Sequence, residues 1–319
     1  MIGRHWKLLI FLYVVFLVTL FLMCSTDLII REPEKEIYQI AVIIEDVRSD
    51  NYSNFRKGMD QAAMEFNADV RFITLYEKLD VEQQMELMDR EQQDGADALI
   101  VVPADEEQMS GKQMMVPVIF LRPGLKGAGM GSITVDYEKM GEQLARGMSE
   151  DIQEDSSVLL LTNPVKQSDM DRMFLKGAEA VLTDNGYSVQ TIEADDEEGV
   201  TASLTNLAAW REGKAVILAE NQEVLMSVAG ILSDDPEAAA HIRGLYGRGS
   251  TVPILNYLDR GYIDGICVTD DFSIGYLSVR AAVQVLDGND NSYVVMDSYY
   301  IEKENLREPY YEKVLFPIE

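Results

Sequence analysis

Short apolar runs alternate with longer amphipathic segments along most of this chain. The first pair is an apolar run at 38–44 and a segment at 55–66, in which Phe55, Met59 and Phe66 share one helical face. The alternation continues with predicted strands at 70–75, 98–102 and 116–121 and, in a second series, at 158–161, 188–192 and 215–219. Strands that alternate with helices form parallel sheets covered on both faces. The pattern therefore predicts an α/β fold with two doubly wound parallel-sheet lobes.

The N-terminal residues carry one long apolar run instead. From Leu8 to Cys24, only Thr19 and the hydroxyl of Tyr13 interrupt the apolar surface, and positive charges precede the run. A helix of this length spans about 26 Å, close to the roughly 30 Å of a hydrocarbon core. A basic start before an apolar run is typical of a signal or anchor segment whose start faces the cytoplasm. Residues 1–24 are therefore expected to form a transmembrane anchor or signal segment.

Cys24 leaves the processing of this segment open. A lipidation site has Gly or Ala directly before the cysteine, whereas Met23 stands there in this chain. A signal peptidase needs small residues before its cut, and no alanine precedes Ala41. An uncleaved anchor is favoured, and a lipid anchor on Cys24 or a cleaved form are the alternatives. The rest of the chain is expected on the extracytoplasmic side of the cell membrane.

Composition excludes several classes of function. The 319 residues carry a formal charge of -28, which repels phosphate backbones, so no nucleic-acid partner is expected. The two histidines and two cysteines lie far apart, without the spacing of metal ligands. The sequence contains neither a calcium-binding loop motif nor an isolated Ser-His-Asp set. We therefore predict a protein that is not an enzyme and that uses no catalytic residue, metal or cofactor.

Seven short motifs follow one another between residues 38 and 306. They lie at 40–63, 94–105, 116–119, 135–141, 172–177, 219–221 and 259–276. The motif at 94–105 reads Asp-Gly-Ala-Asp-Ala-Leu-Ile-Val-Val-Pro-Ala-Asp. In content and order, the motifs resemble those of the type I periplasmic sugar-binding proteins, the ribose- and galactose-binding family. The resemblance implies two lobes, joined by three crossings of the chain, that close over a small polar ligand.

The resemblance also implies a division of the chain. The crossings are expected near Asp136, Asp270 and Met296. The expected parts are a linker at 25–37, an N-terminal lobe at 38–136 plus 271–296, and a C-terminal lobe at 137–270 plus 297–319. Because ligands of doubly wound sheets bind beyond the carboxyl ends of the strands, the site residues should follow the strands directly.

Three candidate ligand-binding residues match positions that the family uses. Tyr52 lies in the loop where the family stacks aromatic rings on a sugar, although it could also pack under its own loop. Arg172 occupies the place of the family's ligand arginine, with a surface salt bridge to Asp169 or Asp171 as the alternative. Asn221 follows a predicted strand and offers a donor and an acceptor, but it could equally cap the next helix.

Four further candidates depart from the family's pattern. Arg122 and Tyr246 stand where sugar binders commonly carry aspartates, so two acceptors for sugar hydroxyls are missing. Thr269 takes the place of a closing glutamine, and Asp270 beside it could supply an acceptor. Together with Asp271, these positions leave the identity of the ligand open.

Four arginines could gather positive charge at the cleft of this otherwise acidic chain. They are Arg48, Arg122, Arg172 and Arg248. Such a cluster would suit a uronate, a phosphorylated sugar or another anion, whereas unrelated surface positions are the alternative. The expected small-molecule ligand is therefore a sugar or an anionic sugar derivative.

The anchor bears on the expected protein partner. A binding domain held close to the membrane suits a sensor that reports ligand to a histidine kinase. Delivery of the ligand to a sugar ABC permease is the alternative. The linker has a contour of at most roughly 45 Å, which suffices for either partner.

Overall fold

The structure, a computed structural model, describes residues 2–24, 37–109, 112–121, 130–205, 212–289 and 293–317. The chain divides into two units, Met1–Ile37 and Tyr38–Glu319. Among its described residues, the first unit contains one helix, α1 (Ile2–Cys24). Its segment His5–Met23 is long and apolar enough to cross a membrane, judged by length and composition, and none of that segment is buried.

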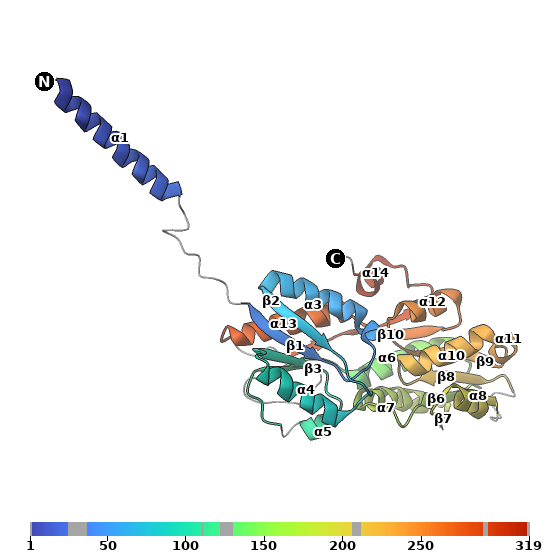
Figure 1. Cartoon of the computed structure of the whole chain (residues 1–319). Coiled ribbons are helices and arrows are strands. Elements are labelled where there is room, and N and C mark those ends of the chain that lie inside the picture. The colour runs from blue at the N-terminus through green and yellow to red at the C-terminus, as the bar shows by residue number, and fades with distance from the viewer. Residues whose placement is uncertain are drawn as a thin grey trace. The chain divides into compact units, whose positions relative to one another are not determined.

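In the described segments of the second unit, the strands form two six-stranded sheets, and the first of these is parallel throughout. The strand order is β11-β5-β4-β3-β1-β2. The strands are β1 (Tyr38–Ile43), β2 (Ala68–Ile73), β3 (Ala98–Val101), β4 (Val118–Phe120), β5 (Met130–Val135) and β11 (Tyr293–Met296). One face packs on α3 (Ser53–Phe66) and α13 (Asp271–Leu286), and the other on α4 (Val81–Gln93) and α5 (Glu106–Met109). We call this sheet and its helices the first lobe (Figure 1).

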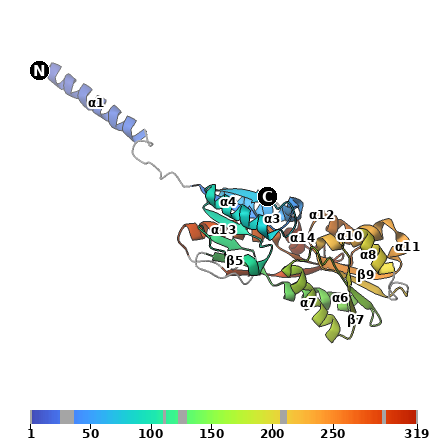
Figure 2. The ribbon, with the colours of Figure 1, turned by 60° about the horizontal axis from the view of Figure 1, so that its bottom comes forward.

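The second sheet has the order β12-β10-β9-β8-β6-β7, and only its β10–β12 pair is antiparallel among the described strands. The strands are β6 (Ser157–Thr162), β7 (Ser188–Glu193), β8 (Ala215–Ala219), β9 (Ile242–Arg248), β10 (Gly265–Thr269) and β12 (Ser298–Glu302). The helices are α6 (Tyr137–Asp151), α7 (Asp169–Asp184), α8 (Glu197–Thr205), α10 (Gln222–Asp234), α11 (Pro236–Ala239), α12 (Val252–Arg260) and α14 (Pro309–Leu315). We call this sheet and its helices the second lobe; Figure 2 shows it beside the first.

The sequence explains why these sheets are buried on both faces. Ile40–Ile44 and Ala215–Ala219 are continuous apolar runs, and every residue in them is fully buried. Such runs suit a parallel sheet that helices cover on each side. The prediction of an α/β fold with two doubly wound sheets is confirmed.

The chain passes between the two sheets at three places. It leaves the first sheet after β5, returns after β10, and leaves again between β11 and β12. Two of the passages are followed directly by a capped helix: Asp136 accepts a hydrogen bond from the backbone of Lys139 at 2.9 Å, and Asp270 accepts one from the backbone of Ser273 at 2.9 Å. The capping aspartates fix where the helices α6 and α13 begin.

In each lobe, two helices cross at glycines. A Cβ atom placed on Gly58 of α3 would overlap the backbone carbonyl of Phe272 in α13, and one placed on Gly275 would overlap that of Phe55. The same holds in the second lobe, where Gly141 of α6 faces α7 and Gly177 of α7 faces α6. Close helix contact at these points requires the absence of a side chain.

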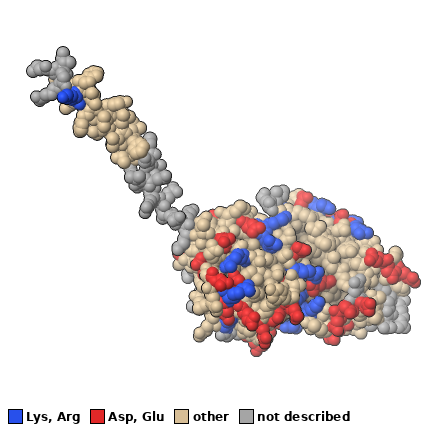
Figure 3. All heavy atoms as spheres, in the orientation of Figure 1, with Lys and Arg blue, Asp and Glu red and all other residues tan. Residues whose placement is uncertain are grey.

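The surface of the second unit is acidic but mixed in sign. Figure 3 shows aspartates and glutamates spread over the visible face, with lysines and arginines among them. This distribution is that of a solvated exterior, consistent with the formal charge of -28.

Candidate functional site

A cavity of about 170 Å³ lies where the carboxyl ends of strands from both lobes meet. Its lining includes Glu45 and Asp46 after β1, Asn221 after β8, and Arg248 at the end of β9. Ligand sites for drug-sized molecules are usually about 300–1,000 Å³, so this cavity suits a smaller solute. Its position beyond the strand ends is where doubly wound folds bind their ligands.

The first lobe contributes two buried carboxylates to the wall. Glu45 is 5% exposed and Asp46 is 4% exposed. The hydroxyl of Tyr52 donates to Glu45 at 2.8 Å, and the side-chain amide of Asn51 donates to Asp46 at 2.8 Å. Burial, together with the neighbouring carboxylate, raises the pKa of Tyr52 well above its ordinary value, so the phenol keeps the proton that it donates. These bonds hold the acids in place beside the cavity.

Tyr52 packs under its own loop and also faces the cavity. Its ring packs edge-on against Phe55, with ring centres 5.9 Å apart, and against Phe72 at 6.0 Å. The same residue lines the cavity. An aromatic face fixed in this way can contact the apolar C–H surface of a ring-shaped solute.

The second lobe contributes an ion pair between Arg248 and Asp171. Arg248 also donates from Nε to the carbonyl of Glu220 at 3.1 Å, and its guanidinium lies 5.3 Å from the ring centre of Tyr137. Asp171 is 1% exposed and accepts from both the backbone and the hydroxyl of Ser168 at 2.8 Å. Burial alone would lower the pKa of Arg248, but the charge of Asp171 raises it overall. The site therefore holds a fixed, oriented cation.

Asn221 lies in the cavity wall and also caps α10. Its side-chain oxygen accepts from the backbone of Glu223 at 3.0 Å and of Val224 at 3.1 Å. Its side-chain amide lies 3.4 Å from Glu220. The helix therefore uses the acceptor of Asn221, and the amide is the group that a ligand can engage.

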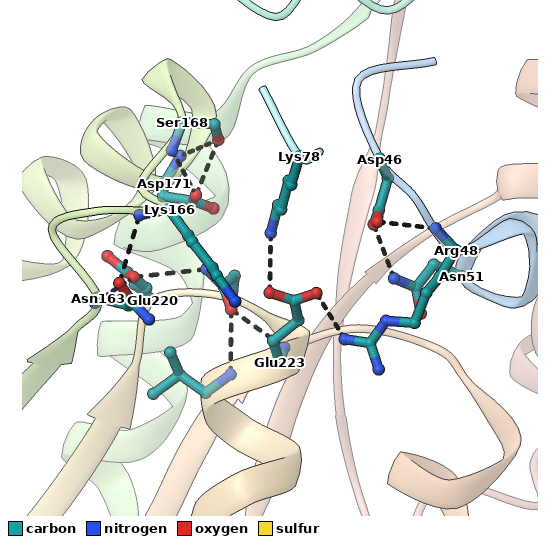
Figure 4. Close-up of polar contacts among 12 residues, drawn as sticks. Asp46, Arg48, Asn51, Lys78, Asn163, Lys166, Ser168, Asp171, Glu220 and Glu223 are labelled. Carbon is teal, nitrogen blue, oxygen red and sulfur yellow. Dashed lines mark hydrogen bonds and ion pairs between the residues drawn. The ribbon is translucent and has the colours of Figure 1, made fainter. Parts of the chain in front are cut away.

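Glu220 supports this wall from behind (Figure 4). It is fully buried, and it accepts from the backbone of Asn163 at 2.6 Å and from the side-chain amide of Gln167 at 2.7 Å. Burial raises its pKa to about 7, because these hydrogen bonds and Arg248 only partly offset the loss of water. Glu220 thus joins the β6–α7 loop to the end of β8.

Stability should therefore depend on pH through Glu220. A folded-state pKa above the ordinary value means that the folded protein binds the proton more tightly than the unfolded chain, so stability falls as pH rises from about 4.5 to about 7. Glu220→Gln should raise the free energy of unfolding by about 2 kcal/mol at pH 8 and change it little at pH 5. Urea unfolding at both pH values measures this. Glu179→Gln, on the exposed surface of α7, is the matched control; an equal effect of Glu220→Gln at both pH values would contradict the assignment.

Asp271, a further carboxylate in the cavity wall, accepts hydrogen bonds from two hydroxyl groups. Thr269 donates to it at 2.6 Å and Ser250 at 2.9 Å, and all three residues line the cavity. The predicted neighbour Asp270 does not line the cavity. Its carboxylate caps α13 by accepting from the backbone and the hydroxyl of Ser273, so the first helical turn uses it instead.

Two other predicted residues also lie away from the cavity. Arg172 is exposed on α7 and pairs with Asp169, because each helical step turns the side chain by about 100° and Asp171 is the residue that faces inward. Tyr246 is 2% exposed and packs with Cys267 in the core of the second lobe. It stands two residues before Arg248 on the same face of β9, too far from the strand end to reach the cavity. Arg122 lies outside the described residues.

The expected gathering of arginines is not found in the part of the chain that the structure describes. Arg248 lines the cavity, Arg172 is on the surface, and Arg48 pairs with Glu223. The described lining has two cationic side chains, Lys78 and Arg248, and four carboxylates, Glu45, Asp46, Asp171 and Asp271. This balance does not favour an anionic ligand.

Sequence reasoning missed Glu45, Asp46, Asp171 and Ser250 as candidates. A signal existed for the first two, since Glu45 and Asp46 directly follow the apolar run of β1. Asp171 was considered only as a salt-bridge partner of Arg172. Ser250 carries no pattern that distinguishes it from other loop serines.

A family model described as a periplasmic binding protein domain matches residues 40–290. The chain belongs to this family. Members of this family bind solutes and are not enzymes, and the binding domain is extracytoplasmic. Both points agree with the sequence prediction. Comparison with curated proteins gave no match.

Solved structures of solute-binding and sugar-binding proteins have the same fold. A carbohydrate transporter solute-binding protein from Agrobacterium radiobacter, in complex with D-arabinose, is 18% identical, with a TM-score of 0.74 over 88% of this chain and 100% of its own. An ABC transporter solute-binding protein from Bacillus halodurans with bound myo-inositol is 16% identical, with a TM-score of 0.72 over 88% and 99%. A glucose-galactose binding protein from Geobacillus stearothermophilus is 17% identical, with a TM-score of 0.70 over 86% and 100%. At these identities the likeness shows the type I fold, as predicted.

Proposed function

We propose that this protein binds a small neutral sugar or cyclic polyol on the extracytoplasmic side of the membrane. The observation that carries the proposal is the cavity between the lobes, with polar groups from both. Carboxylates such as Glu45 and Asp46 accept hydrogen bonds from solute hydroxyls, while Arg248 donates them. Tyr52 offers a fixed aromatic face to the apolar side of a ring. The excess of carboxylates in the described lining favours a neutral solute over an anion.

A ligand panel on the full chain in detergent tests this proposal. The panel contains D-arabinose, D-allose, D-galactose and myo-inositol, with galacturonate and glucose 6-phosphate as anionic comparators. A solute at 100 times its Kd stabilises the folded state by about 2.7 kcal/mol, which raises the Tm by roughly 5 °C or more. We expect a saturable rise with at least one neutral member. A rise with the anions alone, or with none of the panel, would contradict the proposal.

We propose further that helix α1 holds the protein in the membrane and that the bound state is read by a sensor histidine kinase. The apolar segment His5–Met23 supports the first part. Closure of the lobes can carry a signal only if the partner has different affinities for the open and closed forms. Delivery to an ABC permease is the alternative, and its support is that several structural neighbours are ABC transporter solute-binding proteins.

Reconstitution separates the two outputs. For the sensor, autophosphorylation of a co-reconstituted histidine kinase should change only when both this protein and its solute are present. Uptake of the solute by a co-reconstituted ABC permease, strictly dependent on this protein and with an indifferent kinase, would instead establish transport.

A further inference from the structure

Three charged side chains from the two lobes meet at the edge of the cavity (Figure 4). Arg48 and Lys78 stand in the loops after β1 and β2 of the first lobe, and Glu223 is the second residue of α10 in the second lobe. Arg48 Nη2 lies 2.5 Å from one carboxylate oxygen of Glu223, and Lys78 Nζ lies 3.1 Å from the other. One carboxylate thus joins two cations of the opposite lobe.

These contacts differ from the other ion pairs. In the part of the chain that the structure describes, the remaining salt bridges each join residues of a single lobe. Glu223 therefore supplies the ionic link between the lobes among the described residues. Because this link needs both lobes within reach, it exists only while they are close together.

Burial and local structure favour the link. The side chain of Lys78 is 14% exposed and that of Glu223 is 22% exposed, so their attraction is less screened than that of a surface pair. Arg48, at 56% exposed, adds a weaker contact. Glu223 lies in the first turn of α10, where the helix dipole favours a negative charge. The two cations and the helix dipole therefore all stabilise the ionised carboxylate of Glu223.

We propose that Glu223 is an electrostatic latch that biases the solute-free protein toward the closed arrangement of its lobes. The apparent Kd equals the Kd of the closed form divided by the fraction of protein that is closed before solute binds. The latch therefore raises the apparent affinity by the factor by which it raises that closed fraction. The latch acts on the lobes themselves, and it does not depend on which solute the cavity takes.

Pulsed EPR on the solute-free full chain tests the latch. Nitroxide labels are attached to cysteines introduced at Glu86 of α4 and Glu179 of α7, two exposed positions in different lobes, with Cys24 replaced by serine and Cys267 buried. In low salt, Glu223→Gln should lower the ratio of closed to open protein by about threefold to tenfold. Salt at 1 M should lower the ratio in the wild type but not in the variant.

Two further variants complete the test. Removing the cations of the first lobe, by Arg48→Gln with Lys78→Gln, should have the same effect as Glu223→Gln. Asp89→Asn is the matched control, since it breaks an ion pair with Lys112 of 2.8 Å inside the first lobe and should leave the distance distribution unchanged. Equal distributions for wild type and Glu223→Gln at both salt concentrations, or an equal shift with Asp89→Asn, would overturn the latch. Because no solute is added, failure here leaves the proposed binding function standing.

Discussion

Gly177→Ala is expected to lower the free energy of unfolding by about 2–3 kcal/mol. The added methyl group would overlap the backbone of Glu138 in α6, and neither backbone can yield without separating the two helices. This cost exceeds the gain of up to about 1 kcal/mol that alanine normally brings to a helix interior. Urea unfolding at constant m-value measures the change.

Gly230→Ala is the matched control for this change. Gly230 also lies inside a helix, α10, but no atom lies within 4 Å of the position that its Cβ would take. Alanine there should stabilise the protein by about 0.5–1 kcal/mol. Equal effects of the two substitutions would show that the α6–α7 crossing does not depend on Gly177.

Arg248→Met is expected to weaken solute binding at least tenfold and to destabilise the fold by about 3 kcal/mol. The substitution keeps the length of the side chain but removes the charge, which leaves the carboxylate of Asp171 buried without its cation. It also removes a donor that faces the cavity, and a charged hydrogen bond to a buried ligand is worth about 1.5–3 kcal/mol, or at least tenfold in Kd. Calorimetric titration with the solute found in the panel measures the loss.

A second arginine provides the comparison. Arg172→Met removes an exposed pair with Asp169 and should change both stability and Kd by less than about 1 kcal/mol. The double variant Asp171→Asn with Arg248→Met removes both charges, so stability should partly recover while binding stays weakened. Loss of binding with Arg172→Met and not with Arg248→Met would restore the original sequence prediction and refute the site described above.

The fold could be predicted from the sequence because its pattern is repeated and strong. Buried parallel strands must be continuous apolar runs, and the amphipathic segments between them have room for one helix each. The four glycines of the helix crossings also lie in the motif segments 40–63, 135–141, 172–177 and 259–276. The reason for a glycine at these positions could not be read from the sequence. Only the packed helix pairs show that Gly58, Gly141, Gly177 and Gly275 each lie against the backbone of a neighbouring helix.

The site was predicted less completely, because side-chain direction depends on single residues. The predicted arginine of α7 was one helical position away from the residue that faces the cavity, Asp171. Tyr246 was on the correct strand but two residues too early. Tyr52, Asn221 and Thr269 line the cavity, and each also makes a local contact. The ring contact of Tyr52 and the helix cap of Asn221 are the alternative roles that the sequence offered. The hydrogen bond from Thr269 to Asp271 was not foreseen.

The central claim is that a small polar solute binds between the lobes and is held by both. Hydrogen–deuterium exchange on the full chain, with and without the solute from the panel, tests it most directly. We predict slower exchange, on addition of solute, in the segments 44–52 and 271–273 of the first lobe together with 168–171, 219–224 and 248–250 of the second. Protection confined to one lobe, or lying outside these segments, would contradict the account.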